Sequence, residues 1–160
     1  MIRRVVIRRF KRFSAVEFVL PHHIVLAGPN NTGKTTMLQA VAAWSMAFDR
    51  WKGLNDFQRH GGSYTRVPIT RQQFSAVPLR SFDLLWQDRD YRGSIEIEIH
   101  ADPGWRIPLE FVADSTEQVY ARPLKTVDPS VARAAGLITV FVPPMTGLTT
   151  DEPVFTRPRV

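Results

Sequence analysis

The chain has 160 residues, a length that fits one domain, and its 44% hydrophobic content is ordinary for a protein with a core. It contains no cysteine, which excludes a disulfide framework and thiolate metal sites, and no stretch approaches the ~20 apolar residues of a membrane span. The net charge is +6 and 17 of the 21 basic residues are arginine, which is compatible with DNA as a partner, a solvated basic surface being the alternative.

The N-terminal part of the chain predicts three strands. Residues 1–12 are charged and show no signal-peptide pattern, so we expect a cytoplasmic protein without a membrane partner. Ile2–Phe10 alternates loosely and indicates a strand, and Ala15–Leu20 indicates another after a turn at Arg12–Ser14. His22–Ala27 is a nearly unbroken apolar run, which is typical of a strand buried on both faces of a parallel sheet.

A helix is expected from Gly33 to about Arg50, because apolar residues recur at helical spacing and no proline interrupts them. The residues of its apolar face are Met37, Val41, Trp44 and Phe48, with Leu38 and Ala42 beside them. Residues 51–78 are polar and contain glycine, and they predict a long loop or lid. Arg80–Asp90 predicts a short helix.

The second half of the chain predicts mainly β-structure. In Ser94–His100, isoleucines directed inward alternate with Glu96, Glu98 and His100 directed outward. A turn at Asp102–Trp105 predicts a hairpin with Arg106–Ala113. The remaining expected elements are a strand at Val119–Pro123, a helical turn at Pro129–Ala135, an apolar β-rich run at Leu137–Val142 and a tail at Asp151–Val160.

Between the apolar run and the helix lies a complete phosphate-binding loop (Walker A) motif. Its residues are Gly28, Pro29, Asn30, Asn31, Thr32, Gly33, Lys34, Thr35 and Thr36. They match G-x-x-x-x-G-K-[ST] in full, a match that we expect by chance in roughly 0.5% of chains of this length. A Gly-Asn turn between a strand and a helix would explain the glycines, but not a lysine and a threonine at these positions.

Each position of the motif has a role in binding the phosphates of a nucleoside triphosphate. Gly28 and Gly33 allow backbone conformations in which successive N–H groups face the phosphates, and the helix N-terminus adds its dipole. Lys34 is expected to reach the β- and γ-phosphates, and Thr35 to place its hydroxyl on Mg²⁺. Thr36 is a candidate donor to the α-phosphate. ATP and Mg²⁺ are therefore the expected ligands.

The motif and its surroundings resemble the AAA-type P-loop ATPases of the ABC/SMC-like branch, which includes the RecF-like and OLD-type proteins. The resemblance rests on residues 28–41 (GPNNTGKTTMLQAV) and on the lead-in at residues 5–13 (VVIRRFKRF). It is strong over residues 1–50 and weaker over residues 77–89 and 140–148. It implies an α/β fold in which a central P-loop strand belongs to a mixed sheet, with an antiparallel β layer beside it.

The resemblance also implies contacts outside the motif. In such ATPases a Q-loop glutamine touches Mg²⁺ and the attacking water, and Gln87 is the candidate here, with a surface glutamine as the alternative. Lys11, Arg12 and Phe13 match the place where adenine-side contacts arise in that family. A solvated basic turn is an equally good interpretation of these three residues.

The chain departs from the family pattern in its second half. The nearest approach to a Walker B segment is Phe111–Asp114, but Ser115 follows it instead of glutamate. An ABC signature motif of the Leu-Ser-Gly-Gly-Gln kind is also missing from the sequence. We therefore expect residues 1–150 to form the N-terminal lobe of a truncated ATPase domain, with residues 151–160 as a flexible tail. The expected partners are a C-terminal ATPase half or a second copy of the chain.

Three functions follow from these observations. In the first, ATP binding and hydrolysis serve a DNA-linked process. In the second, the chain binds nucleotide without catalysis, because it lacks the acidic residues that hydrolysis needs. The third and least favoured is a nucleotide-kinase-like phosphotransferase, for which Arg66 and Arg71 are the candidate lid arginines.

Overall fold

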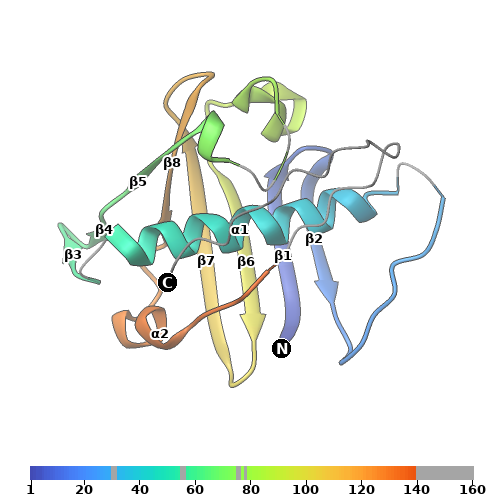
Figure 1. The fold of residues 1–160 in the computed structure, drawn as a ribbon, viewed down its shortest axis with the longest axis horizontal. Helices are drawn as coiled ribbons and strands as arrows, with labels where there is room; N and C mark the ends of the chain where they lie inside the picture. The colour runs from blue at the N-terminus through green and yellow to red at the C-terminus, as the bar shows by residue number, and fades with distance from the viewer. Residues whose placement is uncertain (30–31, 55–56, 75–76, 78, 140–160) are drawn as a thin grey trace, which may run out of the picture.

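The computed structural model describes residues 1–29, 32–54, 57–74, 77 and 79–139, and a six-stranded sheet forms the centre of this part. The order of the strands is β2-β1-β6-β7-β8-β5, and every neighbouring pair is antiparallel. Along the chain, the strands are β1 (Ile2–Phe10), β2 (Phe13–Val19), β5 (Val67–Thr70), β6 (Ile95–Ala101), β7 (Trp105–Ala113) and β8 (Gln118–Pro123). One long helix, α1 (Lys34–Leu54), crosses the sheet (Figure 1).

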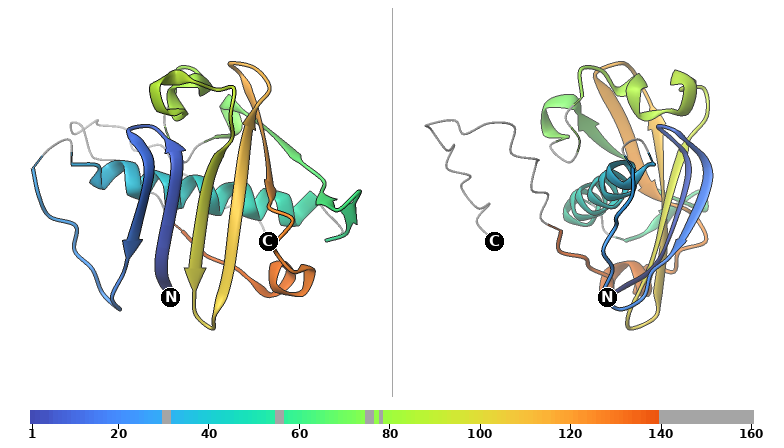
Figure 2. Two further views of the ribbon diagram at one scale, coloured as in Figure 1. Left: turned by 180° about the vertical axis from the view of Figure 1, so that it is seen from behind. Right: turned by 90° about the vertical axis from the view of Figure 1, so that its right-hand side faces the viewer.

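The smaller elements lie around this two-layer arrangement, in which α1 covers one face of the sheet (Figure 2). They are the hairpin strands β3 (Arg59–His60) and β4 (Ser63–Tyr64), the 3₁₀ turns η1 (Arg71–Gln73), η2 (Phe82–Leu85) and η3 (Gln87–Arg89), and the short helix α2 (Pro129–Ala134). Within the described residues, no helix is long and apolar enough to cross a membrane.

The alternation of apolar and charged residues explains the two faces of the sheet. Apolar side chains on the face toward α1 are fully buried, including those of Ile97 and Leu109, which are register partners. The opposite face carries ion pairs between neighbouring strands. These pairs are Arg4–Glu17, Arg8–Glu96, Arg106–Glu98 and Arg122–Glu110. The strands thus bury one face and solvate the other, as the period of two requires.

Two tryptophans fix α1 across the sheet. Trp44 is fully buried, stacks on Trp105 at 5.7 Å, and donates from its indole nitrogen to the Ile107 carbonyl at 3.0 Å. Trp51, two turns later, donates to the Thr65 carbonyl at 2.9 Å. A buried indole needs such a partner for its N–H, so both contacts stabilise the docking of the helix as well as filling space.

The prediction of an α/β P-loop fold, with a central P-loop strand in a mixed sheet, is wrong for the described residues. The six-stranded sheet is antiparallel throughout, and the described residues contain one long and one short α-helix. His22–Ala27, expected as a buried central strand, is an extended segment that belongs to no strand, and Val25 within it is 90% exposed. An apolar run indicates burial, but it does not specify which strand would pair with it.

Most other predicted elements are confirmed. The strands at Ile2–Phe10 and Ser94–His100 and the hairpin partner at Arg106–Ala113 are present as β1, β6 and β7. The helix is confirmed, but it continues to Leu54, so the predicted loop at residues 51–78 begins later than expected. That segment also contains the strands β3, β4 and β5. The short helix predicted at Arg80–Asp90 is instead a pair of 3₁₀ turns. Residues 140–160, including part of the last apolar run and the tail, lie outside the described residues.

Candidate functional site

The candidate site is the loop that joins the extended segment to α1, and Lys34 folds back over it. The Lys34 ammonium donates to the carbonyl oxygens of Gly28 at 2.6 Å and Pro29 at 2.7 Å, and it lies 3.4 Å from the Thr32 hydroxyl. The Thr32 hydroxyl donates to the Pro29 carbonyl at 3.1 Å. Among the described residues no carboxylate pairs with Lys34. An incoming phosphate would therefore compete only with neutral oxygens for this cation.

The N-terminus of α1 points its free donors at the same loop. The first helical hydrogen bond runs from the Met37 N–H to the Gly33 carbonyl at 2.9 Å, so the N–H groups of residues 34–36 have no partner inside the helix. The first turn contains no acidic residue that would offset the positive end of the helix dipole. Free donors and an uncompensated dipole are the two features that attract an anion to a helix N-terminus.

The two motif glycines are required for different reasons. A β-carbon at Gly33 would lie 2.5 Å from the ring of Phe13 and 3.6 Å from the side chain of Arg12, so the β2 strand covers this position closely. Gly33 also has a φ of 96°, which side-chain-bearing residues rarely adopt. Gly28 has a φ of 145°, and an added β-carbon would lie 3.8 Å from the Thr32 hydroxyl, an ordinary contact, so its conformation rather than crowding favours glycine.

The turn between β1 and β2 lies beside the loop, with Arg12 and Phe13 next to Gly33. Arg12 is exposed, and its stem and the Phe13 ring both approach Gly33. Lys11 is directed to α1 instead, where its ammonium donates to the Gln39 side chain at 2.6 Å. Burial lowers the pKa of Lys11. Sequence reasoning missed Gln39, although its position one helical turn after Thr35 could have suggested it.

Gln87 lies near this turn without a hydrogen bond to the loop. It follows Trp86, which forms a β-bridge with Phe10 at the end of β1. The Lys11 N–H donates to the Leu85 carbonyl at 2.7 Å, so the segment holds the turn in place. The hydrogen bonds of the described residues include none between the Gln87 side chain and residues 28–36. Gln87 therefore stays a low-ranked candidate for contact with a nucleotide.

Threonines at the start of α1 supply the remaining polar groups. Thr35 is exposed and Thr36 is half-buried, whereas Asn30 and Asn31 lie outside the described residues. No cluster of three or more His, Asp or Glu side chains that could hold a metal ion occurs in the described part of the chain. The Thr35 hydroxyl would thus be one ligand of a magnesium ion held mainly by phosphate oxygens and water, which is the usual situation for this ion.

The residues that a kinase-like reaction would need are not gathered here. Arg71 is paired with Glu117 at 2.7 Å. Arg66 precedes β5, whose Pro68 carbonyl accepts a hydrogen bond from Arg50 in the C-terminal half of α1. Because α1 is 21 residues and so about 30 Å long, Arg66 is far from the loop at its other end.

The segment closest to a Walker B pattern has a different structural role. Phe111 is buried in the middle of the sheet, in β7, and pairs with Ala121 of β8. Asp114 follows at the turn, where its N–H donates to the Gln118 carbonyl at 3.1 Å. The predicted hairpin of this strand is present as β6 and β7, and Asp114 lies in the next turn, which joins β7 to β8.

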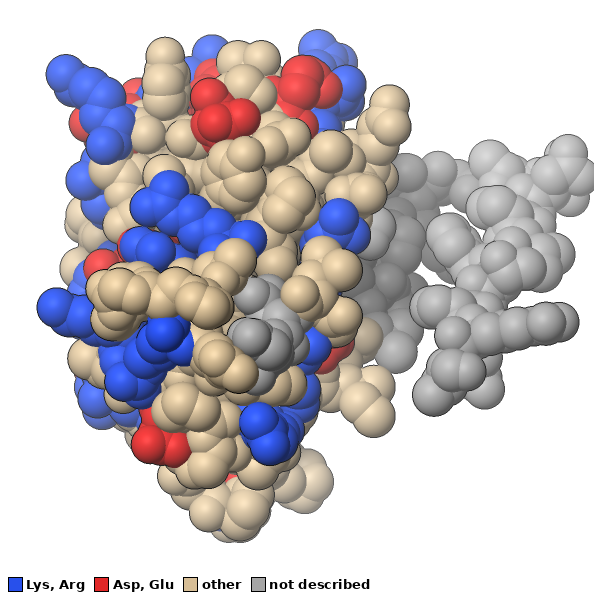
Figure 3. Space-filling view, turned by 90° about the vertical axis from the view of Figure 1, so that its left-hand side faces the viewer, with Lys and Arg blue, Asp and Glu red and all other residues tan. Residues whose placement is uncertain are grey.

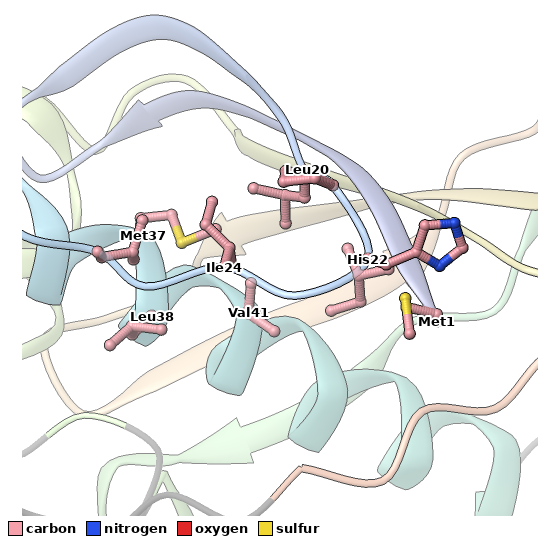
Figure 4. Close-up of a pocket in the computed structure, with 10 residues that line it drawn as sticks. Met1, Leu20, His22, Ile24, Met37, Leu38 and Val41 are labelled. Carbon is pink, nitrogen blue, oxygen red and sulfur yellow. The ribbon is translucent and has the colours of Figure 1, made fainter.

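An apolar groove of about 500 Å³ lies between the extended segment and the N-terminal half of α1. Leu20 and Ile24 line one side, and Met37, Leu38 and Val41 line the helical side (Figure 4). Leu38 is 51% exposed, although it was predicted to lie beside the apolar face of the helix. The groove therefore exposes apolar surface of α1 that the predicted central strand at His22–Ala27 was expected to cover.

Comparisons with known proteins add no further assignment: no protein-family model matches the chain, and no curated protein matches it.

Proposed function

We propose that residues 28–36 bind the phosphates of a nucleoside triphosphate, namely ATP with Mg²⁺. The observation that carries this proposal is the position of Lys34, a cation held over a glycine loop at the N-terminus of a helix whose first turn is free of acidic residues. The motif resemblance to P-loop ATPases is the reason for naming ATP. The absence of cysteine suits the reducing cytoplasm, where ATP is abundant.

In the proposed complex each group has one task. The Lys34 ammonium exchanges the Gly28 and Pro29 carbonyls for the β- and γ-phosphate oxygens, and the free N–H groups of the first helical turn donate to the same phosphates. Thr35 contributes its hydroxyl to the magnesium ion, whose charge neutralises the phosphates. Arg12 and Phe13 border the loop and are placed to contact the rest of the nucleotide.

We first predict that Lys34→Ala removes most of the affinity for ATP–Mg²⁺. Charge-assisted hydrogen bonds contribute about 1.5–3 kcal/mol each, so the dissociation constant should rise by about tenfold or more. Titration calorimetry of both proteins measures this directly. Lys125→Ala is the matched control, because it removes an exposed lysine outside the loop. Equal dissociation constants for ATP in the native chain and in Lys34→Ala would contradict the proposal.

We also predict that this chain alone hydrolyses ATP negligibly. Phosphoryl transfer to water needs a group that positions the water, and the described residues bring no Walker B carboxylate to the loop. The DNA-linked hydrolysis that the resemblance implies would then depend on an acidic residue supplied by a partner. A phosphate-release assay with the Lys34→Ala variant as background tests this. Release well above that background would reveal an unrecognised catalytic carboxylate.

A further inference from the structure

Six basic side chains gather at the end of the molecule opposite the candidate loop. This basic end consists of Arg50, Lys52, Arg59, Arg66, Lys125 and Arg133. Figure 3 looks onto it: Lys and Arg spread across the middle of the face and outnumber Asp and Glu, which are visible near the upper edge and at the lower left. Hydrogen bonds tie the contributing elements together. Lys52 of α1 donates to two carbonyls around α2, and Arg59 of β3 donates to the Val127 carbonyl.

The basic end differs from the rest of the surface in how its charge is balanced. Most other arginines of the described residues form ion pairs, namely Arg3, Arg4, Arg8, Arg9, Arg71, Arg89, Arg92, Arg106 and Arg122. Within the described residues, none of the six side chains of the basic end pairs with a carboxylate. Two acidic residues of the described structure lie at this end. Asp49 of α1 interacts electrostatically with Lys52, and Asp128 caps α2 through Ser130 and interacts electrostatically with Arg59. The six basic side chains outnumber these two carboxylates, so the local charge is positive.

Neutral contacts hold several of these cations in place without neutralising them. Arg50 donates to the Pro68 carbonyl at 2.8 Å, and the guanidinium groups of Arg59 and Arg133 lie over the rings of Tyr64 and Phe57 at 5.3 and 5.2 Å. Each contact uses one N–H or one face of the group, and a guanidinium has five N–H donors. The remaining donors are thus oriented in advance and available to an anionic partner.

The β3–β4 hairpin gives this surface a slender projection. Its tip is Gly61-Gly62, with φ values of 60° and 79° and no atom close enough to meet an added β-carbon. A tip without side chains can approach another backbone closely. Arg59 lies at its base, and Arg66 comes two residues after the end of β4.

We propose that the basic end binds the phosphate backbone of nucleic acid. The arginines of the basic end have guanidinium N–H groups that are not used in ion pairs, and such groups can bind the closely spaced phosphates of a nucleic-acid backbone. A membrane surface would call for apolar anchors among the basic residues. Among the described residues, two exposed large apolar side chains lie on or beside the elements of this end, Leu54 of α1 and Ile138 after α2, whereas Met1, Ile24, Val25 and Leu38 line or adjoin the groove at the other end. This surface is separate from the proposed nucleotide loop, so the two proposals can fail independently.

Fluorescence anisotropy with a labelled duplex of about 20 base pairs, at about 50 mM salt and above, tests the proposal. The variant Arg66→Gln/Lys125→Gln/Arg133→Gln should raise the dissociation constant by at least about tenfold and reduce the slope of log K against log salt by about 2 to 3. The matched control is Arg3→Gln/Arg8→Gln/Arg92→Gln, which removes the same charge from ion-paired positions and should change binding by less than about threefold. Lys34→Ala should bind the duplex normally.

Three results would overturn the proposal: no duplex binding at low salt, equal losses in the two triple variants, or binding to phosphatidylserine vesicles without binding to the duplex. Thermal melts establish that each variant is folded. Arg66 and Lys125 make no hydrogen bond or ion pair in the described structure, so Arg66→Gln/Lys125→Gln decides the question if the triple variant does not fold. It should show about two thirds of the reduction in salt slope.

Discussion

Gly33 joins the candidate loop to the sheet, and one added methyl group tests that junction. We predict that Gly33→Ala destabilises the fold by about 1–3 kcal/mol, because the β-carbon would lie 2.5 Å from the Phe13 ring at a φ of 96°. It should also weaken ATP binding, since the loop must move to relieve the clash. Denaturant melts and calorimetry measure the two effects.

The same substitution at Gly53 provides the control. Gly53 lies in α1 with nothing within 4 Å of its added β-carbon, so Gly53→Ala should stabilise the fold by up to about 1 kcal/mol. Gly33→Ala behaving like Gly53→Ala would mean that the Phe13 ring moves aside freely, and that this contact does not shape the loop.

Motif spacing predicted the positions of the candidate loop, but not what surrounds them. Gly33 and Lys34 follow from a pattern of eight consecutive residues, Gly28–Thr35. The contacts of Phe13 with Gly33 and of Lys11 with Gln39 join residues 20 and 28 positions apart, and no local periodicity encodes them. Only the family resemblance drew attention to the residues of the β1–β2 turn. It did not predict their contacts with Gly33 and Gln39.

At the scale of elements, β6 carries a carboxylate that should make stability depend on pH. Glu98 is only 5% exposed; this burial acts to raise its pKa, but hydrogen bonds from Arg106 and His100 outweigh it and leave the pKa below its ordinary value. A carboxyl with a lowered folded-state pKa stabilises the fold above its unfolded pKa, and the contribution is lost as the pH falls through the folded value. We therefore predict acid destabilisation below about pH 4.

Glu98→Gln should remove this part of the acid sensitivity, so its melting temperature should fall less between about pH 5 and pH 3 than that of the native chain. Glu96→Gln is the control, because Glu96 lies on the same strand and face but forms a more exposed pair with Arg8. Parallel melting curves for the native chain and Glu98→Gln across this range would contradict the prediction.

The elements that the sequence predicted well share one property: their pattern repeats. Ile95, Ile97 and Ile99 alternate with polar residues, and β6 is present with these isoleucines fully or almost fully buried. The failure at His22–Ala27 concerns a run without alternation, whose burial depends entirely on neighbours. Even in β6 the pattern was incomplete, because Glu98 points outward and is nevertheless buried beneath Arg106 and His100.

At the scale of the whole molecule, the groove and the extended segment should promote association. Val25 is 90% exposed, Ile24 46% and Leu38 51%, and residues 22–27 form no backbone ladder within the described residues. We predict that the purified chain self-associates and binds a hydrophobic dye, and that Val25→Asp/Leu38→Asp reduces both. Light scattering and dye fluorescence are the measurements.

Leu54→Asp is the control, since it places the same charge on an exposed apolar position at the other end of α1. It should leave association unchanged. A monodisperse monomer with a sharp cooperative melt and no dye binding would show that the groove is adequately covered, and that the expectation of a missing partner half is wrong.

The overall topology could not be predicted because strand order depends on distant pairings. The sequence indicated most strands, and the β6–β7 hairpin followed from its turn. Nothing in the sequence showed that β1 would pair with β6, or that β5 would join the far edge of the sheet beside β8. The central P-loop strand in a mixed sheet, which the resemblance implied, was wrong because the segment at His22–Ala27 pairs with no strand in the described structure.

The pairing of β1 with β6 has a consequence for how the protein is made. Phe10 ends β1 and Ile95 begins β6. About 84 residues must therefore be synthesised after β1 before β6, the strand that pairs with its free edge, begins to emerge. At about 5–20 residues per second this takes about 4–17 s. During that interval neighbouring nascent chains on one messenger present identical open edges to one another. Yield should therefore depend on uninterrupted translation through Ala101, and slow codons before it should favour inclusion bodies.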